Sequence, residues 1–165
     1  MTQTTNQSLV LRRTLNAPIR MVFNAWTDRE ALAQWWGPQG STVTVKEFNL
    51  TPGGLFHYHL NSQHGEMWGL FKFSEINEPD KLVFVSSFSD EDGNLTRGPF
   101  FPNWPLEVLN VLTLEESEGK TLLTLTAAPI NATDDETKVF TDLHQSMQQG
   151  YAGTFVQLEN YLSKQ

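Results

Sequence analysis

An apolar stripe near the C-terminal end constrains the fold of this chain more than any other feature. Thr133-Asp-Asp-Glu136 has the spacing of a capping box. Beyond it, apolar residues recur every three or four positions, at Val139, Phe140, Leu143, Met147, Tyr151, Phe155, Leu158 and Leu162. This pattern predicts one helix of about 28 residues, roughly 42 Å long. No other predicted element is long enough to cover a whole sheet, so this helix is expected to do so.

Strands dominate the rest of the chain. Alternating apolar and polar residues between turns rich in Gly and Pro predict strands at residues 9–15, 43–50, 55–60, 66–76, 81–88, 106–114 and 121–127. Short turns join most of them, which favours antiparallel pairing in a meander. The predicted fold class is therefore α+β, with a curved antiparallel sheet of about seven strands wrapped around the long C-terminal helix. Side chains that fail to fill the space between them would leave a ligand cavity.

Two short helices are predicted between the first and second strands. The first follows Pro18, a residue that is tolerated in the first helical turn. The second is expected to begin at a capping box formed by Thr27 and Glu30, and to stop at Gly37-Pro38. In the C-terminal helix, Gly150 and Gly153 predict either a kink or a close approach to the sheet.

Length and composition exclude several classes of protein. The 165 residues suit one domain, expected over residues 9–163 after a disordered tail at residues 1–8. The absence of cysteine excludes disulfides and thiolate chemistry. A net charge of −8 disfavours nucleic acid and anionic membranes as partners. Neither an export segment nor an apolar run of about 20 residues is visible, so a cytoplasmic location without a membrane partner is expected.

Short motifs spread over almost the whole chain resemble a known family. They are Ala17-Pro18, Ala25-Trp26-Thr27-Asp28, Trp35-Trp36-Gly37-Pro38, Pro52-Gly53-Gly54, Gly69, Pro79, Leu82-Val83-Phe84, Gly119-Lys120-Thr121 and Gly150-Tyr151. In order and spacing they resemble bacterial relatives of the C-terminal domain of the Hsp90 ATPase activator Aha1 (AHSA1-like), in the START/Bet v 1-like (SRPBCC) superfamily. The resemblance implies a helix-grip fold with a hydrophobic cavity. It supplies no shared catalytic residues.

Aromatic residues are the main candidates for a cavity lining. The predicted ligand-binding set is Trp35, Phe56, Tyr58, Trp68, Phe71, Phe84, Asn110, Met147, Gly150, Tyr151 and Phe155. Gly150 is expected to leave extra room beneath the helix, and Met147 to adapt to different ligand shapes. For each aromatic residue the alternative is ordinary packing in the core. Neither a cofactor nor a metal ion is expected.

The segment His57-Tyr58-His59 has two interpretations. Both imidazoles project from one face of a strand, where they could hold a metal ion with His64 or an acidic residue. The alternative is a solvated face, with Phe56, Tyr58 and Leu60 pointing inward. The alternative is favoured, because the aromatic and aliphatic residues suit the core better.

Candidate catalytic groups and a candidate lid are also present. Glu66, Glu75, Glu107, His144 and Tyr58 are possible acids or bases, but their spacing matches no catalytic triad or carboxylate pair. Residues 90–105, with Arg97, Phe100, Phe101 and Trp104, form either a lid over the cavity or a loop anchored against the body.

The sequence thus predicts binding of a small hydrophobic or aromatic molecule. One alternative is a module that contacts an Hsp90-type chaperone, which the resemblance suggests. Another is a cyclase-like or hydrolase-like enzyme that uses the cavity, and no catalytic constellation supports it. The sequence leaves the oligomeric state open.

Overall fold

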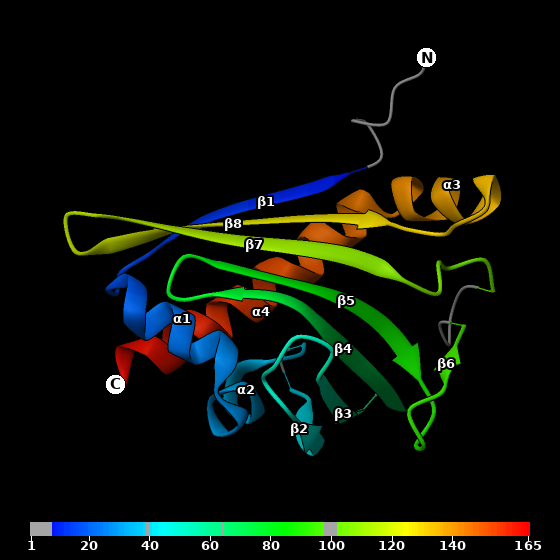
Figure 1. Cartoon of the computed structure of the whole chain (residues 1–165), viewed down its shortest axis with the longest axis horizontal. Coiled ribbons are helices and arrows are strands. Elements are labelled where there is room, and N and C mark those ends of the chain that lie inside the picture. Colours follow the sequence, from blue (N-terminus) through cyan, green and yellow to red (C-terminus); the bar gives the residue numbers. More distant parts are fainter. Residues whose placement is uncertain (1–7, 39, 64, 98–101) are drawn as a thin grey trace.

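The computed structural model describes residues 8–38, 40–63, 65–97 and 102–165 (Figure 1). Its elements are β1 (Leu9–Leu15), α1 (Ile19–Thr27), α2 (Arg29–Trp35), β2 (Thr42–Phe48), β3 (Leu55–Ser62), β4 (Gly65–Asn77), β5 (Lys81–Ser89), β6 (Leu95–Thr96), β7 (Val108–Ser117), β8 (Lys120–Pro129), α3 (Asp134–Asp142) and α4 (His144–Ser163). The described part of the expected tail is Ser8 alone; residues 1–7 lie outside the described residues. The single domain over residues 9–163 stays a prediction.

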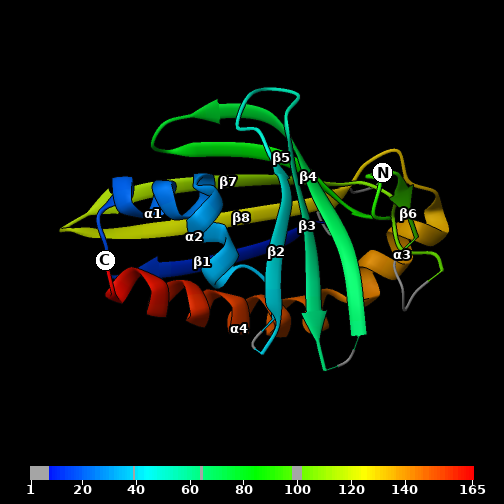
Figure 2. The same ribbon diagram turned by 90° about the horizontal axis from the view of Figure 1, so that it is seen from below.

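One antiparallel sheet organises the molecule, and the predicted α+β helix-grip fold is confirmed. The strand order is β1-β8-β7-β5-β4-β3-β2, and the short β6 pairs with β5. Irregular register after Val45 in β2 and after Phe73 in β4 marks two β-bulges, which increase the local bend. Figure 2 shows the result. The antiparallel strands β1, β7 and β8 lie along one axis, β2, β3 and β4 lie across that axis, and α4 lies along the sheet.

The C-terminal helical segment is two helices rather than one. The capping box is as predicted, because the Thr133 hydroxyl accepts from Glu136 N at 3.1 Å and Glu136 Oε1 accepts from Thr133 N at 2.9 Å. The helix, however, breaks at Leu143, whose φ of −99° and ψ of 9° lie outside the helical region. Apolar spacing did not reveal this break, since α3 and α4 both turn apolar residues toward the sheet.

The two glycines of α4 do not mark the break. Both lie inside a continuous helix, and a Cβ atom added at Gly150 or Gly153 would meet no atom within 4 Å. The predicted close approach to the sheet is therefore wrong at both positions, and α4 continues through them without interruption.

The start of α2 also differs from the prediction. Asp28 is its N-cap, and Asp28 Oδ2 accepts a hydrogen bond from Ala31 N at 2.9 Å. Thr27 still belongs to α1, and its hydroxyl donates to Phe23 O at 2.8 Å. Because the Thr27 hydroxyl already forms a hydrogen bond within α1, the next residue, Asp28, caps α2 instead.

Buried aromatic rings join the two short helices to the sheet. Trp26 and Trp35 meet edge to face with centroids 4.9 Å apart, and the Trp35 indole donates to Ala25 O at 2.9 Å. Phe71 of β4 and Phe84 of β5 stack at 4.2 Å beside them. All four rings are almost completely buried, so they form the centre of the main core.

Hydrogen bonds from α4 hold the end of α2 in place. Gln157 Nε2 donates to Trp35 O at 3.1 Å and to Gly37 O at 2.6 Å, and the Thr154 hydroxyl donates to Gly37 O at 3.1 Å. Gly37 has a φ of +102°, and a Cβ atom there would lie 2.7 Å from Leu60 Cδ2. Glycine is thus required at this position. The turn that it forms leaves Trp36 beneath α4.

We expect Gln157→Ala to lower the free energy of unfolding by about 1–2 kcal/mol, because two buried backbone carbonyls lose a donor. Urea unfolding followed by tryptophan fluorescence measures the change. Gln149→Ala, at an exposed position of the same helix, is the control and should change stability by less than about 0.5 kcal/mol. Equal stabilities of the two variants would contradict the role assigned to Gln157.

Candidate functional site: a cavity between the sheet and α4

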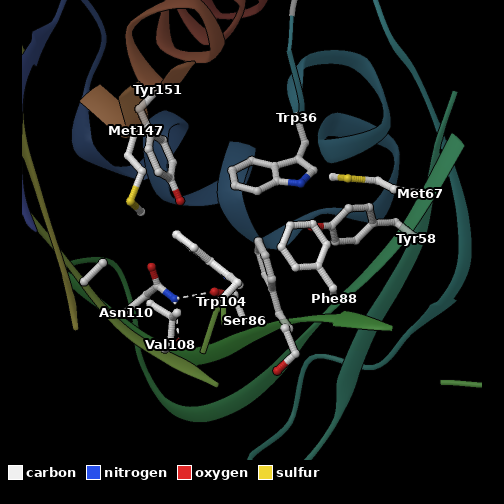
Figure 3. Close-up of a pocket in the computed structure, with 13 residues that line it drawn as sticks. Trp36, Tyr58, Met67, Ser86, Phe88, Trp104, Val108, Asn110, Met147 and Tyr151 are labelled. Atoms are coloured by element: carbon white, nitrogen blue, oxygen red, sulfur yellow. Dashed lines mark hydrogen bonds between the residues drawn. The ribbon is translucent and has the colours of Figure 1, made fainter. Parts of the chain in front are cut away.

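A cavity of about 140 Å³ lies between the inner face of the sheet and α4 (Figure 3). It is lined by Trp36, Tyr58, Met67, Phe71, Ser86, Ser87, Phe88, Trp104, Val108, Asn110, Ala127, Met147 and Tyr151. Strand alternation directs most of these side chains inward, and the four-residue spacing of Met147 and Tyr151 places both on one face of α4. The walls are therefore contributed by β3, β4, β5, β7, β8, α4, the end of α2 and the segment before β7.

Small residues leave the space open. Ser86 and Ala127 stand at inward positions of β5 and β8 where a larger side chain would fill the cavity. Gly69 has a different function, because a Cβ atom there would lie 2.7 Å from the Tyr58 hydroxyl oxygen. Glycine at this position lets the Tyr58 ring lie across β4.

A few polar groups interrupt the apolar lining. Asn110 Nδ2 donates to Ser86 Oγ at 2.9 Å and to Val108 O at 3.0 Å. Among the described residues, Asn110 Oδ1 and the Tyr151 hydroxyl have no hydrogen-bond partner. The buried indole nitrogen of Trp36 also lacks a partner of ordinary geometry. The cavity thus presents both donors and acceptors to whatever occupies it.

The cavity wall is uncharged. None of the described lining residues is acidic or basic. Burial raises the pKa of Tyr58 to about 12, against a smaller opposite effect of the Trp36 indole. Burial also raises the pKa of Tyr151, and the neighbouring Tyr58 adds to the rise. Both phenols therefore remain protonated at neutral pH.

The structure brings together five residues of the predicted set, namely Tyr58, Phe71, Asn110, Met147 and Tyr151. Trp35, Phe56, Phe84 and Phe155 lie in the core behind the lining. Trp68 is on the outer face of the sheet, where its ring contacts His57 and His59. Gly150 is exposed, and a Cβ atom there would meet nothing within 4 Å, so it does not line the cavity.

The predicted ligand-binding set leaves out eight lining residues. They are Trp36, Met67, Ser86, Ser87, Phe88, Trp104, Val108 and Ala127. Alternation along β4 and β5 from Phe71 and Phe84 would have identified Met67, Ser86 and Phe88. The sequence indicates Trp104 only as part of a lid or an anchored loop, because its segment has no regular period that would give the direction of its side chain.

The sequence predicts a solvated outer face for β3, and this prediction is wrong at His57. His57 is only 4% exposed, since the turn between β5 and β6 folds over it. His57 Nε2 lies 3.1 Å from both Ser89 Oγ and Asp90 O. Tyr58 and its neighbours in β3, Phe56 and Leu60, point inward as predicted.

Of the five candidate acids and bases, Tyr58 lines the cavity and the other four lie away from it. Glu66 pairs with His59 at 2.7 Å, Glu75 with Lys81 at 3.3 Å, and Glu107 accepts from Asn131. His144 packs edge-on against Phe140 and does not line the cavity. Within the described residues, no three His, Asp or Glu side chains are grouped to hold a metal ion. His64 lies outside the described residues.

The segment from Arg97 to Trp104 is anchored at both of its described ends. Arg97 forms an ion pair with Glu136 of α3 and also donates to Trp104 O. The Trp104 ring lies 5.5 Å from that of Phe140 and faces the cavity. Trp104 therefore combines the two predicted roles, since it covers the cavity and packs against the body. Phe100 and Phe101 lie outside the described residues.

Comparison with known protein families gives one decisive match. The model of the family described as Activator of Hsp90 ATPase homolog 1-like protein matches residues 16–163. The chain belongs to this AHSA1-like family. Its fold is that of the SRPBCC/Bet v 1-like superfamily, as the sequence motifs predicted. No curated protein is significantly similar in sequence.

Solved bacterial structures share the fold of this AHSA1-like chain. A protein from Arthrobacter aurescens has a TM-score of 0.82 at 23% identity, covering 100% of this chain and 91% of the other. One from Mycobacterium smegmatis has a TM-score of 0.79 at 23% identity, with 98% and 94% covered. One from Staphylococcus epidermidis has a TM-score of 0.77 at 28% identity, with 96% and 90% covered. In the described part of the AHSA1-like chain, the helices are too short or too polar to span a membrane.

The raised pKa values predict that the protein loses stability in base. Below about pH 10 both cavity phenols are protonated in the folded and unfolded states, so they cause no pH dependence. Between pH 10 and 12 the two phenols ionise in the unfolded protein but stay protonated in the folded protein. The free energy of unfolding should therefore fall by up to about 1.4 kcal/mol per pH unit for each group.

Urea unfolding at pH 8, 10 and 11 tests this expectation. Tyr58→Phe and Tyr151→Phe should each lose less stability with rising pH than the unmodified protein. Gln149→Ala is the control, because it removes no titratable group; Tyr161→Phe is unsuitable, since burial and the nearby Asp28 also raise the pKa of Tyr161. If neither variant changes the pH dependence of unfolding, the pKa values of these two phenols are not raised in the folded protein.

Proposed function

We propose that this AHSA1-like chain binds a small hydrophobic or aromatic molecule in the cavity between the sheet and α4. The fold is generally a ligand-binding fold. The observation that carries the proposal for this chain is a cavity walled by aromatic rings, without charge, in which the buried indole nitrogen of Trp36 lacks a partner of ordinary geometry. Buried polar groups are normally satisfied, so this indole N–H favours an occupant.

The size of the cavity limits the ligand. An apolar cavity of about 150 Å³ is known to bind benzene. The volume of about 140 Å³ here thus suits one six-membered ring with a small substituent. Removal of about 150 Å² of apolar surface from water contributes roughly 4 kcal/mol, which corresponds to dissociation constants near 1 mM for the simplest ligands. Binding assays must therefore detect weak affinity.

Titration with toluene, followed by NMR shifts of the tryptophan indole N–H groups, tests the proposal. We expect saturable shifts at Trp36, because its indole forms part of the wall. Met147→Trp should weaken toluene binding at least tenfold, since the larger side chain fills the cavity from α4. Gly150→Leu is the matched control on the same helix and should bind as the unmodified protein does, because its side chain enters open space.

Two further results bear on the proposal. Native mass spectrometry of protein purified without detergent tests for an occupant that binds more tightly than these simplest ligands; a discrete additional mass that denaturation removes would support the proposal. Absence of toluene binding, together with a bare native mass, would refute the proposed function. A cytoplasmic location belongs to the same proposal and is tested by fractionating cells that express the chain.

The family match favours a second candidate, contact with an Hsp90-type chaperone. Recovery of Hsp90 in stoichiometric amounts with the affinity-tagged chain would support it. The cavity does not require this contact, and Met147→Trp should leave such recovery unchanged. The two functions can therefore be separated by one variant.

A further inference from the structure

We infer that the preferred ligand is a neutral aromatic ring with one hydroxyl group, held by Tyr151, Asn110 and Ser86. This inference rests on the proposed function and specifies its ligand class. It depends on three observations: where the polar groups of the lining lie, which further hydrogen bonds they can make, and the lack of charge around them.

The polar groups gather on one side of the cavity. Figure 3 shows the Tyr151 hydroxyl pointing from α4 into the cavity, toward the region where Asn110 and Ser86 project from the sheet. Asn110 is only 1% exposed and is fixed by its bonds to Ser86 Oγ and Val108 O. The remaining lining is mostly aromatic and aliphatic. A ligand with one polar end and one apolar ring matches this division.

The remaining hydrogen-bonding capacity favours a hydroxyl group. Both Asn110 Nδ2 hydrogens are used, so its Oδ1 can only accept. Ser86 Oγ already accepts from Asn110, which leaves the Ser86 hydroxyl hydrogen to donate. Tyr151 is protonated and can donate or accept. A ligand hydroxyl can donate to Asn110 Oδ1 while it accepts from Tyr151 or Ser86, whereas a methyl group satisfies none of them.

The electrostatics exclude charged ligands. No described lining residue carries a charge that could pair with a carboxylate or an ammonium group. Moving an unpaired ion from water into such a site is strongly unfavourable. An anion would also face the acceptor oxygen of Asn110. The polar side of the cavity therefore selects a neutral group.

Four small aromatic compounds test this inference on the unmodified protein. Phenol and toluene have nearly the same shape, so their comparison isolates the hydroxyl group. Benzamide and benzoate likewise isolate the charge. We expect phenol to bind about tenfold more tightly than toluene, as one or two buried hydrogen bonds provide. Benzoate should bind at least tenfold more weakly than benzamide at pH 7.

Variants identify the residue that recognises the hydroxyl. Tyr151→Phe should reduce the preference for phenol over toluene to about threefold or less. Tyr161→Phe is the matched control, since Tyr161 is on the same helix and does not line this cavity. Ser86→Ala provides a second variant that should lower the same preference.

The outcomes separate this inference from the proposed function. If toluene binds as tightly as phenol, or benzoate as tightly as benzamide, the ligand class is wrong although the cavity binds ligands. If none of the four compounds binds, the proposed function itself fails. The ligand series uses the unmodified protein, so the test stands even if a variant does not fold.

Discussion

The carbonyl oxygen of Gly37 is the point on which the arrangement around the cavity depends. It receives hydrogen bonds from Thr154 and Gln157 of α4, at a turn that only glycine tolerates. These bonds fix the distance between α4 and the short helices. Because Trp36 directly precedes this turn, the same bonds place its indole in the cavity wall. The position of one backbone carbonyl thus couples the packing of the helices to the shape of the site.

Much of the fold was predictable because it follows from local periodicity. The strands and the capping box at Thr133 appeared within a few residues of their predicted positions. The site was harder, because a side chain's direction depends on exact position. Trp68 lies three residues from Phe71 on the same strand, so the two must face opposite sides of the sheet. Gly150 directly precedes Tyr151 on α4, and adjacent helical residues point about 100° apart.

Other features depended on contacts between distant parts of the chain. His57 is buried because a turn more than thirty positions away covers it, as its contacts with Ser89 and Asp90 show. Trp104 reaches the cavity because Arg97 and Glu136 hold its segment against α3. Neither contact leaves a periodic signal in the sequence. Local patterns determine which elements form, whereas the surroundings of a particular side chain also depend on long-range packing.

The cavity lies where two separate hydrophobic cores meet. Tyr58, Phe71 and Tyr151 belong with the main core, whereas Val108, Ala127 and Met147 belong with a smaller one built around Leu9 and Phe140. Across the break at Leu143, α3 contributes Phe140 to the smaller core, whereas α4 contributes Met147 to the smaller core and Phe155 to the main one. The gap between the two cores, together with the small Ser86 and Ala127 side chains that border it, therefore sets the size of the cavity. An occupant would touch both cores and join them into one continuous apolar interior.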